Sequence, residues 1–175
     1  MTLRDWLPPT FGFAIATSTA AVLGMVATQR SVDTSWYDAL AKPPFQPPRR
    51  VFGPTWTVLY VGIAMSGVRV WRARRSPART RALVLWGTQL ALNAAWSALF
   101  FGAKKPTYAL VEIGALLGAI ALYASYARKL DKIAAWLVVP YLAWTSFATV
   151  LNQEIVRRNP AVVGNHPINA PAARI

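Results

Sequence analysis

The chain of 175 residues contains no cysteine and a single histidine, His166. Without cysteine, disulfides, zinc–thiolate sites, iron–sulfur clusters and thiol nucleophiles are excluded. Because the one histidine lies in the C-terminal tail, a Ser–His–Asp triad or a multi-histidine metal site inside the fold is excluded as well. We therefore expect no metal site and no resident cofactor.

Charged residues are also scarce. They make up 14% of the chain against 55% hydrophobic residues, whereas soluble domains carry about 25% charged residues. The formal charge is nevertheless +13, and the basic residues stand between long apolar stretches. This placement is typical of the loops of a membrane protein and not of a nucleic-acid-binding surface, so we expect no nucleic-acid partner.

Five long stretches contain no charge or a single one. About 20 apolar residues are needed to cross the hydrocarbon core, and their backbone amides must be satisfied within the segment. The sequence therefore predicts an all-α integral membrane protein, a multi-pass bundle of five transmembrane helices in one domain (1–160). The predicted spans are 8–28, 52–71, 82–102, 107–127 and 133–156, with a long first loop (29–50) and a disordered tail (161–175).

The start of the first stretch favours a retained helix over a cleaved signal peptide. Asp5 offsets Arg4, which leaves a poor positively charged leader, and the apolar run opens with Pro8 and Pro9. Proline suits the first turn of a helix, where its missing N–H has no partner to lose.

The predicted first loop is rich in aromatic residues and prolines. Pro43, Pro44, Pro47 and Pro48 stiffen its second half in an extended conformation. Trp36 and Tyr37 have two interpretations: they cover the mouth of the bundle as a lid, or they anchor the chain at headgroup depth.

The third and fifth spans each carry one distinctive face. In the third span, one helical stripe has two amides among aromatic residues, which predicts that it faces protein or a cavity, or bonds to other helices. In the fifth span, the small side chain of Ala148 leaves room beside Trp144 for a flat ligand. The stripe of the third span consists of Trp86, Gln89, Asn93, Trp96 and Phe100; the face of the fifth consists of Trp144, Ala148, Leu151 and Asn152.

Two features of the fourth span leave alternatives open. Gly114 and Gly118 form a GxxxG pair, which permits close helix approach within one bundle or between two chains. Glu112 is an acid inside a span, which is either functional or a bystander near the membrane surface, within reach of Lys105.

Three motifs in this order resemble the tryptophan-rich sensory protein or translocator protein family, also called peripheral-type benzodiazepine receptors. They are Trp-Tyr-x-x-Leu-x-Lys-Pro-x-Phe-x-Pro-Pro at 36–48, Gln-Leu-x-Leu-Asn-x-x-Trp-Ser-x-Leu-Phe-Phe at 89–101 and Pro-Tyr-Leu-x-Trp-x-x-Phe-Ala-x-x-Leu-Asn at 140–152. The resemblance extends over about residues 6–160.

This resemblance implies a receptor or sensor, often a homodimer, that binds porphyrins such as protoporphyrin IX and sterol-like lipids beneath the first loop. Porphyrin would be a ligand and not a cofactor. By motif position, the pocket residues would be Trp56, Asn93, Trp96, Trp144, Ala148 and Leu151, and the covering residues Trp36, Tyr37 and Pro47.

The resemblance leaves other activities open. Some bacterial members are reported to degrade bound porphyrin in light, which would assign a photochemical role to Trp56 and Trp144; transport of porphyrin or lipid is a further alternative. The chain departs from mammalian members in one place, because Gln153 and Glu154 stand where those carry a sterol-motif tyrosine. Since the bundle contains no histidine, we expect a free-base porphyrin, or a haem held without histidine ligation.

Overall fold

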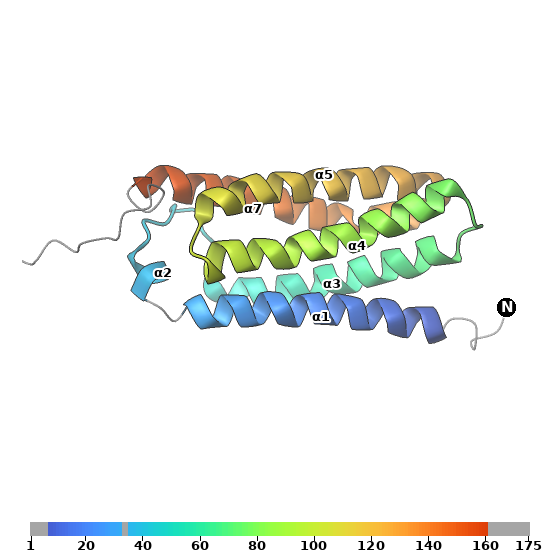
Figure 1. Cartoon of the computed structure of the whole chain (residues 1–175), viewed down its shortest axis with the longest axis horizontal. Helices are drawn as coiled ribbons and strands as arrows, with labels where there is room; N and C mark the ends of the chain where they lie inside the picture. Colours follow the sequence, from blue (N-terminus) through green and yellow to red (C-terminus); the bar gives the residue numbers. More distant parts are fainter. Residues whose placement is uncertain (1–6, 33–34, 161–175) are drawn as a thin grey trace, which may run out of the picture.

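The computed structural model, which describes residues 7–32 and 35–160, consists there of helices without strands. The long helices lie side by side, and the short α2 lies at one end of the bundle (Figure 1). Helix α4 packs against α5, α1 against α3, and α5 against α7. The helices are α1 (Leu7–Val32), α2 (Ser35–Ala39), α3 (Arg49–Arg72), α4 (Pro77–Ser97), the π-helix η2 (Ala98–Gly102), α5 (Pro106–Leu130), α6 (Lys132–Leu137) and α7 (Val139–Arg158).

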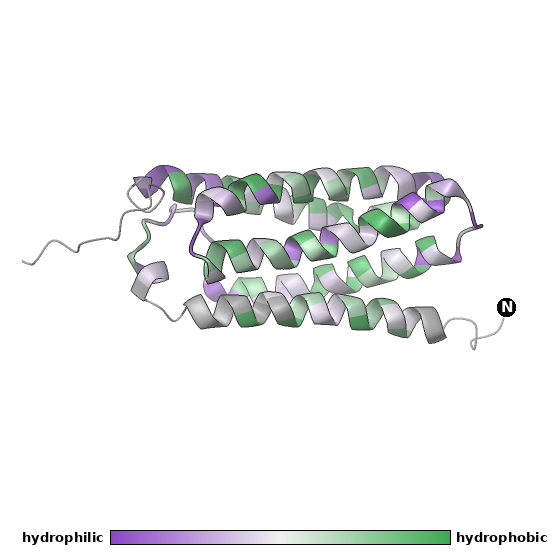
Figure 2. Ribbon diagram, in the orientation of Figure 1, coloured by the Kyte–Doolittle hydropathy of each residue, from purple (hydrophilic) through white to green (hydrophobic). Residues whose placement is uncertain are grey.

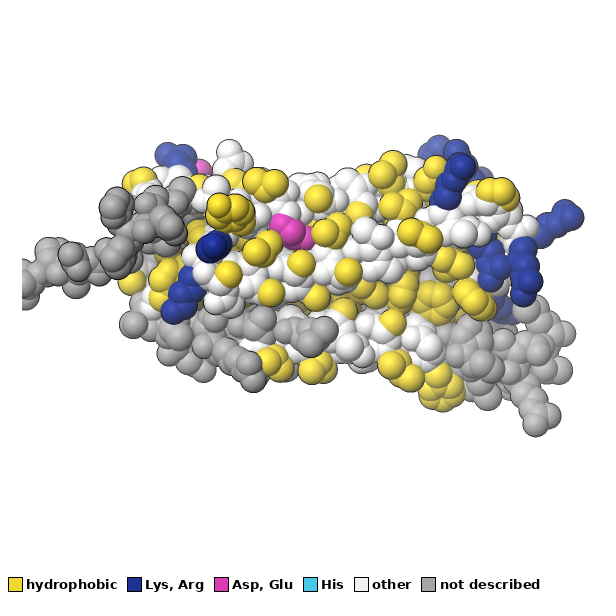
Figure 3. Space-filling model, viewed as in Figure 1, with side chains coloured by type: hydrophobic (Ala, Val, Ile, Leu, Met, Phe, Trp, Pro, Cys, Tyr) yellow, Lys and Arg dark blue, Asp and Glu magenta, His cyan; other side chains and the backbone are white. Residues whose placement is uncertain are grey.

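Four helical segments are long and apolar enough to cross a membrane. In α1, the apolar stretch found among the described residues is shorter and covers Thr10–Val22. Apolar residues predominate along the middle of the bundle (Figure 2), and on the face shown in Figure 3 the Lys and Arg side chains gather at its two ends. The four segments are Arg49–Arg72, Pro77–Gly102, Pro106–Leu130 and Lys132–Arg158.

The helices differ from the predicted spans at several boundaries. Inside the predicted loop 29–50, α1 continues to Val32, α2 occupies Ser35–Ala39 and α3 begins at Arg49. Lack of charge marks lipid-length segments, but helices continue beyond them because Arg and Lys are good helix formers. Residues 41–48, which hold the prolines, are not helical. The predicted tail 161–175, with His166, lies outside the described residues.

The fifth predicted span is interrupted near its start. Helix α6 ends at Leu137 and α7 begins at Val139. Pro140 accounts for the break, because its ring cannot follow a continuous helical turn and its nitrogen cannot donate to the preceding one. Val138 is buried at the break and carries the chain from one helix to the other.

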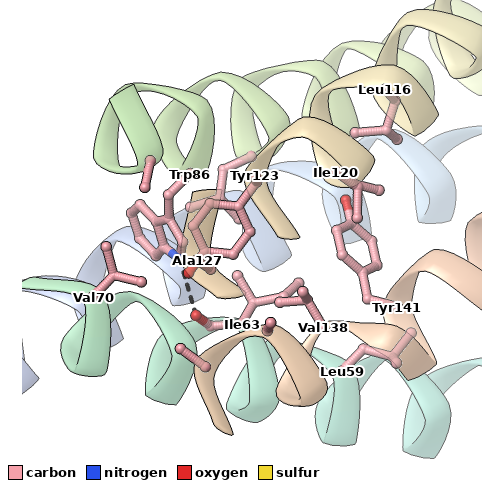
Figure 4. Close-up of a cluster of buried hydrophobic side chains, with 14 of the residues drawn as sticks. Leu59, Ile63, Val70, Trp86, Leu116, Ile120, Tyr123, Ala127, Val138 and Tyr141 are labelled. Atoms are coloured by element: carbon pink, nitrogen blue, oxygen red, sulfur yellow. Dashed lines mark hydrogen bonds between the residues drawn. The ribbon is translucent and has the colours of Figure 1, made fainter. Parts of the chain in front are cut away.

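Hydrogen bonds cross between helices in the half of the core distant from α2. The Trp86 indole Nε1 donates to the Ile63 carbonyl at 2.9 Å, which joins α4 to α3 (Figure 4). The Ser66 hydroxyl donates to the Ala134 carbonyl at 2.7 Å and lies 2.6 Å from the Tyr123 hydroxyl. These bonds satisfy polar groups that lipid could not.

An ion pair closes the same end of the bundle. Arg69 of α3 lies 2.9 Å from Asp131, whose carboxylate also accepts the Ala134 N–H at the start of α6. Partial burial raises the pKa of Asp131, but the Ala134 N–H and the Arg69 guanidinium outweigh it and hold that pKa below its usual range. Asp131 therefore stays ionised, and it fixes α6 to α3.

Gly67 of α3 lies where side chains of α1 and α4 leave no room for a Cβ. A Cβ built there would lie 2.5 Å from the Phe13 ring and 2.7 Å from the Trp86 indole nitrogen. Since Trp86 is held by Ile63, Gly67→Ala should destabilise the fold by about 1–3 kcal/mol through overpacking. The measurement is the unfolding midpoint in detergent. Gly87→Ala is the control, because nothing lies within 4 Å of its added Cβ; equal midpoints for the two variants would contradict the packing described.

Candidate functional site

Trp56, Tyr60 and Asn93 form the inner part of the candidate site, where α3 faces α4. The Trp56 ring lies 5.4 Å from the Tyr60 ring, one helical turn away. The Asn93 amide donates to the Tyr60 hydroxyl at 3.0 Å. Asn93 is only 4% exposed, so this amide turns inward from the membrane-spanning helix and joins α4 to α3.

Helix α7 closes this group from a third side. The Tyr141 ring lies 6.2 Å from that of Trp56. One turn further along, Trp144 packs edge-on against Phe52, with ring centroids 5.6 Å apart. Ala148 packs with these residues against the same core cluster, so a small side chain does follow Trp144 on the inner face.

A second aromatic cluster lies beneath α2. Trp96 stacks on Phe100 at 5.1 Å, and Trp36 meets Phe100 edge-on at 6.2 Å. The Tyr37 ring lies 5.7 Å from Phe101. Trp96 packs against both this cluster and the main core, and Leu151 packs against this cluster. Trp96 is therefore the side chain that links the inner group to the covering segment.

The π-helix η2 presents both phenylalanines to this cluster. The Ala103 N–H donates to the Ala98 carbonyl at 2.7 Å, the wide turn of a π-helix. Phe100 is 2% exposed and its neighbour Phe101 is half-buried. A π-helical turn is often found at functional sites, and here it directs two adjacent rings toward Trp96.

The loop 41–48 is fastened to the bundle by side chains. The Asn159 oxygen accepts the Ala41 N–H at 2.8 Å, and the Asn159 amide donates to the carbonyls of Ala41 (3.1 Å) and Ile155 (2.7 Å). Gln46 donates to the Tyr37 hydroxyl at 3.3 Å, and burial raises the pKa of Tyr37, which therefore stays neutral. Pro47 is half-buried next to Gln46.

Several buried polar atoms in this region have no hydrogen-bond partner among the described residues. Each lies on a residue within one helical turn of Asn93 or Tyr141, or is part of Tyr141 itself. An unpaired buried donor or acceptor costs about 1–3 kcal/mol, so this interior is suited to a molecule that supplies the missing partners. The atoms are Gln89 Oε1, Trp96 Nε1, the Tyr141 hydroxyl and Thr145 Oγ1.

Cationic side chains surround the loop end of the site. Lys42 and Arg49 lie over the Tyr37 ring at 4.6 and 5.6 Å, and Lys104 lies 5.9 Å from the Trp36 ring centre. Glu154 binds Arg157 and Arg158 at 2.9 and 3.0 Å. Within the described ranges, no three His, Asp or Glu side chains are grouped as a metal site.

The prediction that the stripe of the third span faces protein is confirmed. Trp86, Gln89, Asn93 and Phe100 are buried and Trp96 is half-buried. The structure brings Trp56, Trp96, Trp144 and Ala148 to one core, which Asn93 joins through its bond to Tyr60. The adjoining cluster contains Trp36, Tyr37 and Leu151. Pro47 belongs to neither cluster.

Sequence reasoning missed two contributors, and it left the role of Glu112 open. Tyr60 is absent from the predicted pocket residues, because its bond to Asn93 joins two helices and spacing within one helix does not reveal it. Asn159 acts on Ala41, 118 residues away, and no local pattern marks it. Glu112 is half-buried without a partner among described residues, and the Lys105 ammonium lies over Tyr108 instead.

The fold and site define a class: an all-helical membrane protein with an aromatic interior beneath its first loop. The chain matches the TspO/MBR family over residues 6–158 and belongs to that family. It is therefore an integral, multi-pass membrane protein.

Its relatives include proteins from animals, archaea and bacteria. Human translocator protein is 37% identical over 160 residues, which cover 88% of this chain and 91% of that protein. The tryptophan-rich protein TspO of Archaeoglobus fulgidus is 41% identical, covering 78% and 87%. The tryptophan-rich sensory protein of Cereibacter sphaeroides is 40% identical, covering 71% and 77%.

The contacts of Asn159 generate a prediction for the loop. Asn159→Ala removes the acceptor of the Ala41 N–H and two further bonds. We expect hydrogen exchange in the segment 36–48 to accelerate about tenfold, equivalent to about 1.4 kcal/mol of lost local stability. Exchange is read by mass spectrometry, with the exposed Gln153→Ala as control. Unchanged protection in Asn159→Ala would show that other contacts hold the loop.

Proposed function

We propose that this protein is a receptor or sensor that binds porphyrins, such as protoporphyrin IX, between α3, α4 and α7 beneath the loop that follows α2. The unpaired buried polar atoms among indole rings carry this proposal. Indole faces suit the flat pigment, while the Trp96 N–H and the Tyr141 hydroxyl offer polar groups to its nitrogens or carboxylates. The residues that carry these atoms lie in two of the three family motifs, 89–101 and 140–152.

The proposal includes α1 as a fifth membrane-spanning helix. Its 26 residues extend over about 39 Å at 1.5 Å per residue, more than the hydrocarbon thickness of about 30 Å. A membrane-spanning α1 places its own first turn and the loop after α2 at opposite ends of the bundle, as the ribbon has them (Figure 1).

Porphyrin binding requires the site to open. In the structure, Trp56, Tyr60 and Tyr141 pack on one another, and Trp144 is covered by Phe52 and Phe147. Trp56 and Trp144 are only half-buried, so each has an edge toward the outside. Displacement of Trp144 with the proline-stiffened loop would admit a flat molecule without separating the helices, and the same site would accept sterol-like lipids.

Basic residues at the loop end favour an acidic ligand. Lys42, Arg49 and Lys104 stand where propionate groups at the edge of a porphyrin would emerge. Asp38 already pairs with Arg49 at 2.8 Å, so a ligand carboxylate would compete for that cation. The described bundle offers no histidine to ligate iron, which favours a free-base porphyrin.

A porphyrin titration tests the proposal. Protoporphyrin IX should quench tryptophan emission of the detergent-solubilised protein saturably, and Trp144→Ala should weaken the affinity about tenfold, because stacking and burial are both lost. Trp136→Ala is the matched control, since this indole is 71% exposed on α6. The titration is run in the dark, so that bleaching does not imitate loss of binding. Equal affinities of the two variants would exclude this site.

We also propose a homodimer through the outer face of α5. Gly114 and Gly118 are exposed there, and nothing lies within 4 Å of a Cβ added to either, so the pair is open to a second chain. Gly118→Leu should convert dimers into monomers in analytical ultracentrifugation. Gly12→Leu, at an equally open position on α1, should leave the dimer intact. A monomeric parent protein, or a dimeric Gly118→Leu variant, would contradict this seam.

A further inference from the structure

A surface hollow lies at the opposite end of the bundle from α2. Its volume is about 420 Å³, and the hairpin between α3 and α4 forms it. Figure 3 shows Lys and Arg side chains, in dark blue, gathered at this end of the bundle. The lining residues are Trp71, Arg75, Arg79, Thr80, Leu83 and Val84.

The polar side of the hollow is cationic and lacks a described counter-charge. The Arg79 guanidinium lies over the Trp71 ring at 4.7 Å, and its Nε–H has no acceptor among the described residues. Neither Arg75 nor Arg79 pairs with a carboxylate of the described chain, whereas the nearby Arg69 is paired with Asp131. Two guanidinium groups therefore line one hollow, with no carboxylate of the described residues paired to either of them.

The other side of the hollow is apolar and extends toward the membrane. Val84 is 63% exposed and Trp71 47% exposed. Val84 lies five residues beyond Arg79 in α4, which is about 7.5 Å along the helix axis. The hollow thus joins the charged hairpin to the lipid-facing surface, and tryptophan at this depth is typical of the membrane interface.

We infer that this hollow binds an anionic phospholipid. The phosphate would lie between Arg75 and Arg79, beside the Thr80 hydroxyl, where guanidinium groups offer paired donors. The first part of the acyl chains would lie on Leu83, Val84 and the Trp71 ring. A phospholipid satisfies both sides of the hollow, whereas a free phosphate ion would leave the apolar side exposed.

Neighbouring arginines provide a sharp test. The full-length protein in neutral detergent is titrated with phosphatidylglycerol, phosphatidylcholine or inorganic phosphate, and bound lipid is counted by native mass spectrometry. Arg75→Gln and Arg79→Gln should each weaken phosphatidylglycerol binding about fivefold. Arg74→Gln removes the same charge from the adjacent exposed position, which does not line the hollow, and should change the affinity less than twofold.

Each outcome decides the inference. Preference for phosphatidylglycerol over phosphatidylcholine, with loss in Arg75→Gln but not in Arg74→Gln, supports a defined lipid site. Equal loss in both variants would show a diffuse positive field and overturn it. Inorganic phosphate that displaces the lipid at equal concentration would assign the hollow to a free anion. If Arg79→Gln fails to fold, the comparison of Arg75→Gln with Arg74→Gln, both at exposed positions, still tests the inference.

Discussion

Hydrocarbon offers no hydrogen-bond partners, and this constraint organises the bundle. Polar side chains of the membrane-spanning helices either bond to a carbonyl of their own helix, as the exposed Ser125 and Ser146 do, or turn inward and find one another. Asn93 does so by donating to Tyr60, Trp86 by donating to Ile63, and Ser66 by joining Tyr123 to Ala134. The same constraint makes each inward polar atom without a partner informative, because it has neither water nor lipid headgroups to replace the missing bond.

The two halves of the interior differ in this respect. Near Gly67 the contacts are close and the Trp86 indole makes its hydrogen bond, so α1, α3 and α4 pack tightly on one another. Nearer to α2, the Trp96 N–H, the Tyr141 hydroxyl and the Thr145 hydroxyl remain unpaired among aromatic rings. One half of the interior is closely packed, and the other half contains buried polar atoms without hydrogen-bond partners. This arrangement is expected of a bundle that keeps its fold while it admits a ligand.

Composition was sufficient to predict helices, membrane insertion and the inward face of the third span. A charge-free stretch long enough to cross the bilayer is stable there as a helix. An amide side chain on that helix is tolerated when it points away from the lipid. The ends of the helices are harder to predict from composition, because charged residues also lie inside helices. Helix α3, for example, begins at Arg49 and ends at Arg72. The fastening of Ala41 by Asn159 could not be predicted, since the two residues meet only after α7 has returned to the end of the bundle where the first loop lies.

The fastening of the loop by Asn159 connects the covering segment to α7, the helix that carries Trp144. Two hydrogen bonds from the Asn159 side chain to Ala41 join the cover to α7, and they can be released without unpacking a helix. Since Asn159 follows the last turn of α7, and Trp144 lies on the same helix, a ligand that displaces Trp144 acts on the element that holds the cover. Occupancy of the interior would thereby alter the surface presented by the loop, which is the physical requirement for a sensor: a bound molecule must change what the outside of the bundle displays.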